Sequence, residues 1–203
     1  RDPNRDRFIL SKGHSSIGLY AALALRGYIP IEELKTFDAI DSRLQGHPAM
    51  DLLEGIDMST GSLGQGLSPG IGMAIAARLQ ESSFHTFVML GDGDSQEGQI
   101  WEAALVAGRY NLDNITAILD LNGLQQYGWA TKNGYNKAAR MPPQDNPVSR
   151  WQAFGWNTIE IDGHNIEKFI DACSTAKKHK GQPTILIAHT IKGKGISYME
   201  NDF

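Results

Sequence analysis

The sequence lacks the features that would place it in several large classes of protein. It has one cysteine, Cys173, which excludes an intrachain disulfide and favours a reducing, cytoplasmic setting. It has no apolar run of about 18 residues, so we expect no membrane span. Its net charge of -4 is spread without blocks of one sign. This charge gives no electrostatic reason to expect nucleic acid or an anionic membrane as a partner.

Two common phosphate-binding motifs are also missing. No G-x-x-x-x-G-K-[ST] run occurs, which argues against a P-loop. The stretch that begins at Gly91 reads GDGDSQEG, so its glycines lack the G-x-G-x-x-G spacing of a dinucleotide-binding turn. Asp92, between the first two glycines, would repel a bare diphosphate unless a metal ion lay between them. These observations disfavour a plain nucleotide-binding domain.

The sequence does contain an alternation of apolar strands and helices. Nearly continuous β-branched runs are typical of strands in a parallel sheet covered on both faces, and apolar residues at three- and four-residue spacing predict helices. The alternation predicts an α/β fold, a doubly wound and mostly parallel sheet with helices on both faces. With 203 residues, we expect one domain over residues 1–203, truncated at both ends. The expected strands are Phe84–Leu90, Ile115–Leu121, Thr184–His189 and, more weakly, Trp156–Ile161, and the expected helices are Ile17–Arg26, Leu67–Leu79, Glu97–Tyr110 and Ile166–Lys178.

Polar residues follow two of the expected strands, about thirty positions apart. Asp92 lies after the first strand and Asn122 after the second. A helix of about 14 residues runs back roughly 21 Å and a strand of about 6 residues returns roughly 20 Å, so both residues reach the same sheet edge, where ligands of open α/β sheets bind. One carboxylate and one amide oxygen suit Mg²⁺, which completes its coordination with phosphate oxygens and water. The spacing therefore predicts a diphosphate held through Mg²⁺, although Gly-Asp-Gly and Asn-Gly are each common turns.

An ordered set of short motifs resembles the transketolase family. GDG followed by Asn is similar to the thiamine diphosphate motif, which related enzymes share, and the other motifs narrow the resemblance to transketolase. The sequence is most similar to the amino-terminal subunit of a split transketolase, in which the diphosphate-binding domain is a separate polypeptide. The motifs span essentially the whole chain in this order: SKGH (Ser11–His14), GHP (Gly46–Pro48), TGSLGQG (Thr60–Gly66), EG with WEA (Glu97–Ala103), DGH (Asp162–His164) and TIKGKG (Thr190–Gly195).

The resemblance implies thiamine diphosphate as the cofactor, with Mg²⁺ or another divalent cation such as Ca²⁺ or Mn²⁺. It implies the side chains of Asp92 and Asn122 and the backbone carbonyl of Leu124 as metal ligands. Gly93 would offer its backbone N–H to the diphosphate. The implied cofactor-binding residues are His14, Gly61, Ser62, Leu63, Asp92, Gly93, Asn122 and Lys192.

The resemblance also implies a catalytic set of His14, His47, Glu97 and Glu102. The histidines would move protons at the sugar hydroxyls, with His47 facing the donor sugar, and the two glutamates would link active sites across a dimer interface. Ordinary alternatives stay open for three of these residues and for Lys192. Either histidine suits an exposed turn, Glu97 suits the first turn of a helix, and Lys192 suits a solvated glycine loop.

A partner chain is the next implication. In the family, the glutamate that activates the aminopyrimidine lies in a pyrimidine-binding domain that nothing in this sequence matches. We expect that domain on a C-terminal transketolase subunit, in an α₂β₂ assembly that acts on sugar phosphates, and we expect this chain alone to be inactive. Ser62 stands where many one-chain transketolases have proline, which favours the split type. A long polar loop at residues 123–146 is expected beside the site.

Three other functions remain possible on sequence alone. The first two are the E1 α subunit of a 2-oxoacid dehydrogenase and a deoxyxylulose phosphate synthase, which share the cofactor and the fold. The histidines of SKGH and GHP weigh against both, because a ketoacid donor does not need these hydroxyl-directed groups. The third is a non-catalytic scaffold that keeps the cofactor-binding fold, which the intact set of Asp92, Asn122, His14 and His47 disfavours.

Overall fold

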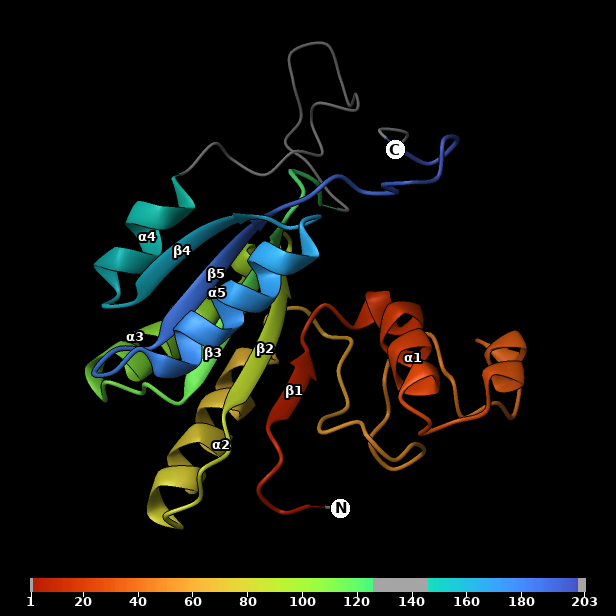
Figure 1. The fold of residues 1–203 in the computed structure, drawn as a ribbon, viewed down its shortest axis with the longest axis horizontal. Helices are drawn as coiled ribbons and strands as arrows, with labels where there is room; N and C mark the ends of the chain where they lie inside the picture. The colour runs from red at the N-terminus through yellow and green to blue at the C-terminus, as the bar shows by residue number, and fades with distance from the viewer. Residues whose placement is uncertain (1, 126–145, 201–203) are drawn as a thin grey trace.

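The computed structural model describes residues 2–125 and 146–200. Its centre is a parallel sheet with the strand order β1-β2-β3-β5-β4 (Figure 1). All four strand pairings are parallel, which confirms the predicted α/β class. The strands are β1 (Arg7–Leu10), β2 (Thr86–Gly91), β3 (Ile115–Leu121), β4 (Asn157–Asp162) and β5 (Thr184–His189).

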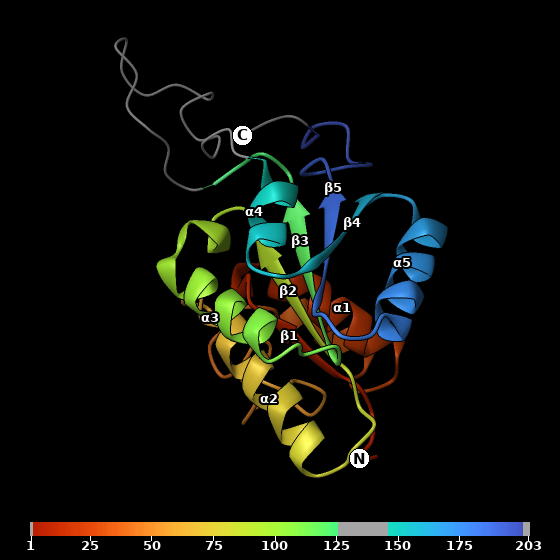
Figure 2. The ribbon, with the colours of Figure 1, turned by 90° about the vertical axis from the view of Figure 1, so that its left-hand side faces the viewer.

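Helices cover both faces of this sheet, as predicted. Successive residues of a strand point to opposite faces, so Val88 and Ala117 contact one layer of helices while Ile118 contacts the other. Helices α2, α3 and α4 form the first layer and α5 the second (Figure 2). The helices are α1 (Ser16–Leu25), α2 (Leu67–Leu79), α3 (Gly98–Arg109), α4 (Pro147–Ala153) and α5 (Ile166–Lys178), with short 3₁₀ segments η1 (Gly13–Ser15), η2 (Ile31–Thr36) and η3 (Asp94–Gln96).

The boundaries predicted for β3, β5, α2 and α5 agree with the structure residue for residue, and the other predicted boundaries differ by one or two residues. Strand β1 and helix α4 were not expected. Strand β1 has 4 residues and helix α4 has 7. Segments this short carry too few apolar repeats for their type to be identified from the sequence. Helix α4 does have a start signal: Asn146 accepts a hydrogen bond from the Ser149 N–H at 3.1 Å, and Pro147 occupies the first turn.

Strand β4 contacts both α4 and α5, yet it is less buried than its neighbour β5. This strand lies at the sheet edge beyond β5, and its residues are half-buried or exposed. Trp156, expected to open the strand, instead precedes it and is buried against Trp151. Its indole N–H donates to the Ala104 carbonyl of α3 at 2.9 Å, so the ring anchors the α4–β4 connection to α3.

Helix α1 does not lie on the sheet but in a separate lobe beside β1 (Figure 1). Its buried residues Tyr20, Leu23 and Ala24 pack with apolar side chains between residues 29 and 56. The Tyr20 hydroxyl donates to the Gln45 carbonyl at 2.8 Å, which fixes the segment just before His47. This lobe therefore delivers the GHP motif to the carboxyl edge of the sheet.

The described residues, 2–125 and 146–200, include no helix that is both long enough and apolar enough to cross a membrane. The greater part of the polar loop expected at residues 123–146 lies outside the described residues.

Candidate functional site

The candidate site is built from loops at the carboxyl edge of the sheet. The loop after β1 carries Lys12 and His14, and the ends of β2 and β3 carry Asp92 and Asn122. Because β2 and β3 are neighbours in register, with Gly91 opposite Asp120, the residues that follow them meet. The strand spacing in the sequence predicted this meeting.

Asp92 and Asn122 are in direct contact. The Asp92 carboxylate is 3% exposed, and its Oδ2 accepts the backbone N–H groups of Asn122 and Gly123, both at 2.8 Å. A carboxylate has about four lone-pair sites, so two hydrogen bonds leave capacity for a cation. The end of β2 thus holds the turn after β3 through one acidic side chain.

The turn after β3 places further oxygen ligands beside Asp92. The Asn122 Oδ1 accepts the Leu124 N–H at 2.9 Å, which folds the Leu124 backbone onto the Asn122 amide. Within residues 2–125 and 146–200, no group of three or more His, Cys, Asp or Glu side chains is arranged to hold a metal. A metal at this turn would therefore rely on one carboxylate with amide and carbonyl oxygens, a set that fits Mg²⁺ completed by phosphate and water.

The electrostatics of Asp92 favour a positive ligand. Burial raises the pKa of its carboxyl group above the ordinary value, and the nearby charge of Asp120 adds to the increase, whereas the hydrogen bonds from Asn122 and Gly123 oppose it. A carboxylate that is costly to ionise when empty gains stability from a cation that neutralises it. The structure therefore fits a divalent ion at Asp92.

The TGSLGQG loop lies against both histidine motifs. A Cβ atom added to Gly61 would come within 3.0 Å of the His47 ring, and one added to Gly13 within 2.8 Å of the Gly61 nitrogen. Leu63 in turn reaches the backbone of Gly93, since a Cβ there would lie 3.5 Å from its Cδ1. The two glycines at 13 and 61 permit a close approach of backbones, which brings the predicted residues of these loops together.

Ser62 is exposed within the same loop. Its backbone carbonyl accepts the Gln65 N–H at 3.4 Å, so the loop turns back on itself after Ser62. This turn leaves the Ser62 side chain on the surface, where a bound molecule or a partner chain can reach it.

His14 is exposed at the edge of the candidate site, near the positive charges of Lys12 and Lys192. Partial burial by the surrounding loops lowers the pKa of the His14 ring, and the positive charges of Lys12 and Lys192 lower it further, while Asp94 acts in the opposite direction. Lys12 and Lys192 are thus near enough to act on His14, while His47 reaches the same loops through its contact with Gly61. At neutral pH His14 is therefore a neutral imidazole, able to accept or donate a proton.

Glu97 lies against the TGSLGQG loop, since a Cβ atom added to Gly64 would come within 2.5 Å of the Glu97 Cβ atom. Glu97 is the N-cap residue of α3, with no hydrogen bond from its side chain to the helix, rather than its first helical residue as predicted. Glu102 is one turn further along α3, and both residues are exposed. Neither contacts Asp92 or Asn122 through a described hydrogen bond, so the structure brings Glu97 to the TGSLGQG loop but joins neither glutamate to the proposed metal ligands.

Asp94 was missed by the sequence analysis, yet it joins three of the loops. This fully buried carboxylate accepts the Ser11 hydroxyl at 2.9 Å and the Gly64 N–H at 2.7 Å on Oδ1, and the Gly91 N–H at 2.9 Å on Oδ2. It connects the SKGH, TGSLGQG and GDG motifs. The available signal was a second acidic residue two positions after Asp92, inside a stretch that already drew attention.

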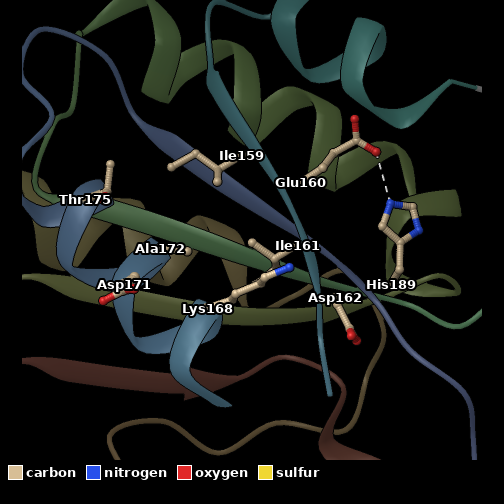
Figure 3. Close-up of a pocket in the computed structure, with 9 residues that line it drawn as sticks. All are labelled: Ile159, Glu160, Ile161, Asp162, Lys168, Asp171, Ala172, Thr175 and His189. Atoms are coloured by element: carbon tan, nitrogen blue, oxygen red, sulfur yellow. Dashed lines mark hydrogen bonds and ion pairs between the residues drawn. The ribbon is translucent and has the colours of Figure 1, made fainter. Parts of the chain in front are cut away.

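A surface hollow of about 480 Å³ lies elsewhere, between the edge strand β4 and helix α5 (Figure 3). The hydrogen bond of 3.0 Å between His189 and Glu160 crosses its rim. None of the predicted site residues lines this hollow. The candidate site is therefore formed by converging loops and is separate from this open groove.

Comparisons with known proteins agree with this geometry. Residues 2–202 match the family described as transketolase, thiamine diphosphate binding domain. The chain belongs to the transketolase family. The members it is similar to are named as transketolases or transketolase subunits, which are transferases, and the thiamine diphosphate-binding character of the domain is thereby shown.

Two relatives are named as transketolase subunits. The 6-deoxy-6-sulfo-D-fructose transketolase subunit SqwG of Clostridium sp. (strain MSTE9) is 44% identical over 198 residues, which cover 98% of this chain and 69% of the relative. A subunit of the apulose-4-phosphate transketolase of Phocaeicola vulgatus is 40% identical over 200 residues, covering 98% of this chain and 68% of the relative. The chain thus spans about two thirds of each relative.

Longer transketolases match over a smaller share of their length. Mouse transketolase is 43% identical over 203 residues, which cover 99% of this chain and 30% of that protein. The crystal structure of transketolase from Campylobacter jejuni superposes with a TM-score of 0.84 at 36% identity and covers 97% of this chain and 31% of that one. In these transketolases the matching domain is one part of a larger polypeptide.

Proposed function

We propose that this chain is the cofactor-binding subunit of a split transketolase and that, with a partner subunit, it transfers a two-carbon ketol unit from a ketose phosphate to an aldose phosphate. The observation that supports the proposal most is the contact of Asp92 with the turn at Asn122. A buried carboxylate and an amide meet at the sheet edge where glycine loops converge.

The proposed cofactor site follows from this contact. Asp92, Asn122 and the Leu124 carbonyl would hold Mg²⁺, and the metal would hold the diphosphate. Gly93 would donate its N–H to the diphosphate, and Lys192 would neutralise its charge. Gly61, Ser62 and Leu63 would lie along the aminopyrimidine.

When bound, thiamine diphosphate supplies the nucleophilic carbon that cleaves a sugar C–C bond and carries the two-carbon unit. This chain's histidines would serve the sugar. His14 is neutral at neutral pH, so its imidazole can take a proton from a sugar hydroxyl and return it. His47, which packs on Gly61, would bind and orient the donor.

The partner would complete the site. We infer that a C-terminal transketolase subunit carries the pyrimidine-binding domain, with its activating glutamate, in an α₂β₂ assembly. The two relatives named as subunits support this proposal because a subunit implies a second chain. The exposed Glu97 and Glu102 would lie at the resulting interface, and the reducing setting inferred from one cysteine supports a cytoplasmic location.

The two subunit relatives also suggest a class of substrate. One is named for a sulfonated fructose and the other for apulose 4-phosphate, so both sugars carry an anionic group. We propose that the substrate of this chain is likewise a ketose with a terminal anion.

An activity assay of the assembled complex tests the proposed function. The chain, co-expressed and purified with its partner subunit, should release aldose from xylulose 5-phosphate when ribose 5-phosphate is the acceptor, and should leave pyruvate unchanged. The chain alone serves as the control and should be inactive. Turnover of pyruvate without ketol transfer would contradict the proposal and favour a 2-oxoacid dehydrogenase or a deoxyxylulose phosphate synthase. Cofactor binding without turnover of any ketose would indicate a scaffold.

A further inference from the structure

Asp120 lies near the end of β3, a strand whose other residues up to that point are apolar or Thr. Two side chains from distant loops bind its carboxylate: the Lys12 ammonium contacts Oδ2 and the Thr190 hydroxyl donates to Oδ1. In the sheet, Asp120 stands between Gly91 of β2 and Ala188 of β5. One carboxylate therefore joins the loops that follow β1, β3 and β5.

Each residue of this network lies two positions before a predicted cofactor-binding residue in the sequence. Lys12 lies two residues before His14, and Thr190 lies two residues before Lys192. Asp120 itself lies two residues before Asn122, whose side-chain amide is 3.5 Å from its Oδ2. Each loop that meets at Asp120 thus carries a predicted cofactor-binding residue just beyond the contact.

Backbone hydrogen bonds attach the beginning of each flanking loop to the neighbouring strand. The Lys12 N–H donates to the Met89 carbonyl at 3.3 Å, and the Thr190 N–H donates to the Leu121 carbonyl at 3.1 Å. Beyond these points both loops leave the sheet. Side chains then continue the attachment: Asp94 accepts the Ser11 hydroxyl and His164 accepts the Ile191 N–H, each in one loop, whereas Asp120 is bound by side chains of both loops.

The ion pair between Lys12 and Asp120 is buried, so its net contribution to the stability of the fold is expected to be small. The side chains of Lys12 and Asp120 are 9% and 14% exposed, so both charges lose most of their hydration. A buried pair of this kind is often no better for stability than well-packed apolar residues. Its geometric role, the joining of three loops, is the better reason for its presence.

We propose that Asp120 is a positioning residue that holds the three loops after β1, β3 and β5 in the arrangement that binds the diphosphate. The inference rests on the proposed function. Asp120 need not touch the cofactor, because it acts through Lys12, Thr190 and its own strand.

The test measures cofactor affinity in the purified complex with the partner subunit. Asp120→Asn and Thr190→Val should each raise the Kd for thiamine diphosphate with Mg²⁺ by about tenfold or more in calorimetry, as removal of outer partners of a bound group does. At saturating cofactor, kcat should fall by a smaller factor than the affinity does, because Asp120 acts through the loops and touches no reacting group. Thr190→Val changes shape least and guards against a folding defect in the Asp120 variant.

Asp113→Asn is the matched control. Asp113 precedes the other end of β3 and binds Arg78 at 3.0 Å and the Gly181 N–H at 3.1 Å, so it too joins distant segments through a carboxylate. This variant should lower stability in urea without changing the Kd. A purely structural role for Asp120 would make the two Asp variants behave alike.

The double variant Lys12→Met with Asp120→Leu distinguishes the effect of an unpaired buried charge from the effect of losing the connection between the loops. It removes both buried charges, so we expect it to fold, yet its Kd should stay raised because the loops are no longer joined. Wild-type affinity in this variant, or unchanged or tighter binding in Asp120→Asn, would overturn the inference. Failure of the wild-type complex to bind the cofactor would instead overturn the proposed function, so the two failures are distinguishable.

Discussion

At the scale of single residues, the buried side chain of His85 links the stability of the fold to pH. His85 is 4% exposed near the amino end of β2, where its Nε2 lies 2.7 Å from the Thr116 hydroxyl and its ring packs on Phe87. The pKa of His85 is lowered to about 4. Burial is the main cause, the charge of Asp6 opposes the decrease, and the charge of Lys177 adds to it. Folding thus requires a neutral imidazole at this position.

This requirement predicts acid sensitivity. Because the folded pKa of His85 lies below the unfolded value, the unfolded chain binds the extra proton, and stability falls as the pH drops from about 6.5 towards 4. At pH 4.5 the loss from this group should be roughly 2–3 kcal/mol, by urea unfolding. His85→Gln should flatten the pH dependence of the unfolding free energy. Parallel pH profiles for wild type and His85→Gln would contradict this explanation.

Residue-scale chemistry was predictable only where it followed a local pattern. The meeting of Asp92 and Asn122 could be predicted because one helix and one strand separate them, and regular elements have fixed lengths. Asp94 and Asp120 could not be assigned in the same way. The Lys12 partner of Asp120 is 108 residues away in the chain, and the Ser11 partner of Asp94 is 83 residues away. Only the folded topology brings such pairs together.

At the scale of elements, α2 shows how closely the helices pack on the sheet. Gly70 and Gly72 lie in this helix on different faces. A Cβ atom at Gly70 would come within 2.5 Å of Val88 Cγ2 in β2, whereas one at Gly72 would meet nothing within 4 Å. Gly70 therefore permits the close approach of α2 to the sheet, whereas Gly72 faces open space.

A matched pair of alanine variants tests this packing. Gly70→Ala should destabilise the protein by about 1–3 kcal/mol, because overpacking moves α2 away from the sheet. Gly72→Ala should stabilise it by up to about 1 kcal/mol, because alanine has the higher helix propensity. Urea denaturation of both variants measures the difference. Equal effects would show that α2 does not pack as the structure describes.

Element type was predictable where an apolar pattern extended over the complete segment, as in α2, α5, β3 and β5. Apolar patterning over a complete element fixes its type and ends. It could not predict the edge position of β4, because strand order depends on contacts between distant segments. Nor could it separate α1 from the sheet, because the lobe that α1 joins is assembled from irregular segments between residues 29 and 56.

At the scale of the whole molecule, the proposed assembly must cover apolar surface. Along α3, Leu105 is 56% exposed, Val106 is 39% exposed and Tyr110 is 63% exposed, and Glu102 lies one turn before Leu105. Residues three and four apart share a helix face, so these side chains form one strip on α3. We expect this strip to lie in an interface of the assembly.

A charge placed in this strip tests the expectation. Leu105→Asp should weaken assembly of the purified complex by about tenfold or more, because a buried apolar contact would become a desolvated carboxylate. Ile166→Asp, at a residue of α5 that is 75% exposed, is the control and should leave assembly intact. Sedimentation at several concentrations distinguishes the variants. Equal assembly of wild type and Leu105→Asp would remove α3 from the interface.

The most direct test of the metal–diphosphate site is calorimetric titration of thiamine diphosphate into the complex of this chain with its partner subunit, with and without Mg²⁺. We predict binding that requires Mg²⁺ and is weakened at least about 100-fold by Asp92→Asn, which removes the charge but can keep the hydrogen bonds from Asn122 and Gly123. Asp51→Asn, at an exposed carboxylate, should bind as the wild type does. Binding that is independent of Mg²⁺, or equally tight in Asp92→Asn, would contradict the proposal that Asp92 and Asn122 hold the diphosphate through a metal.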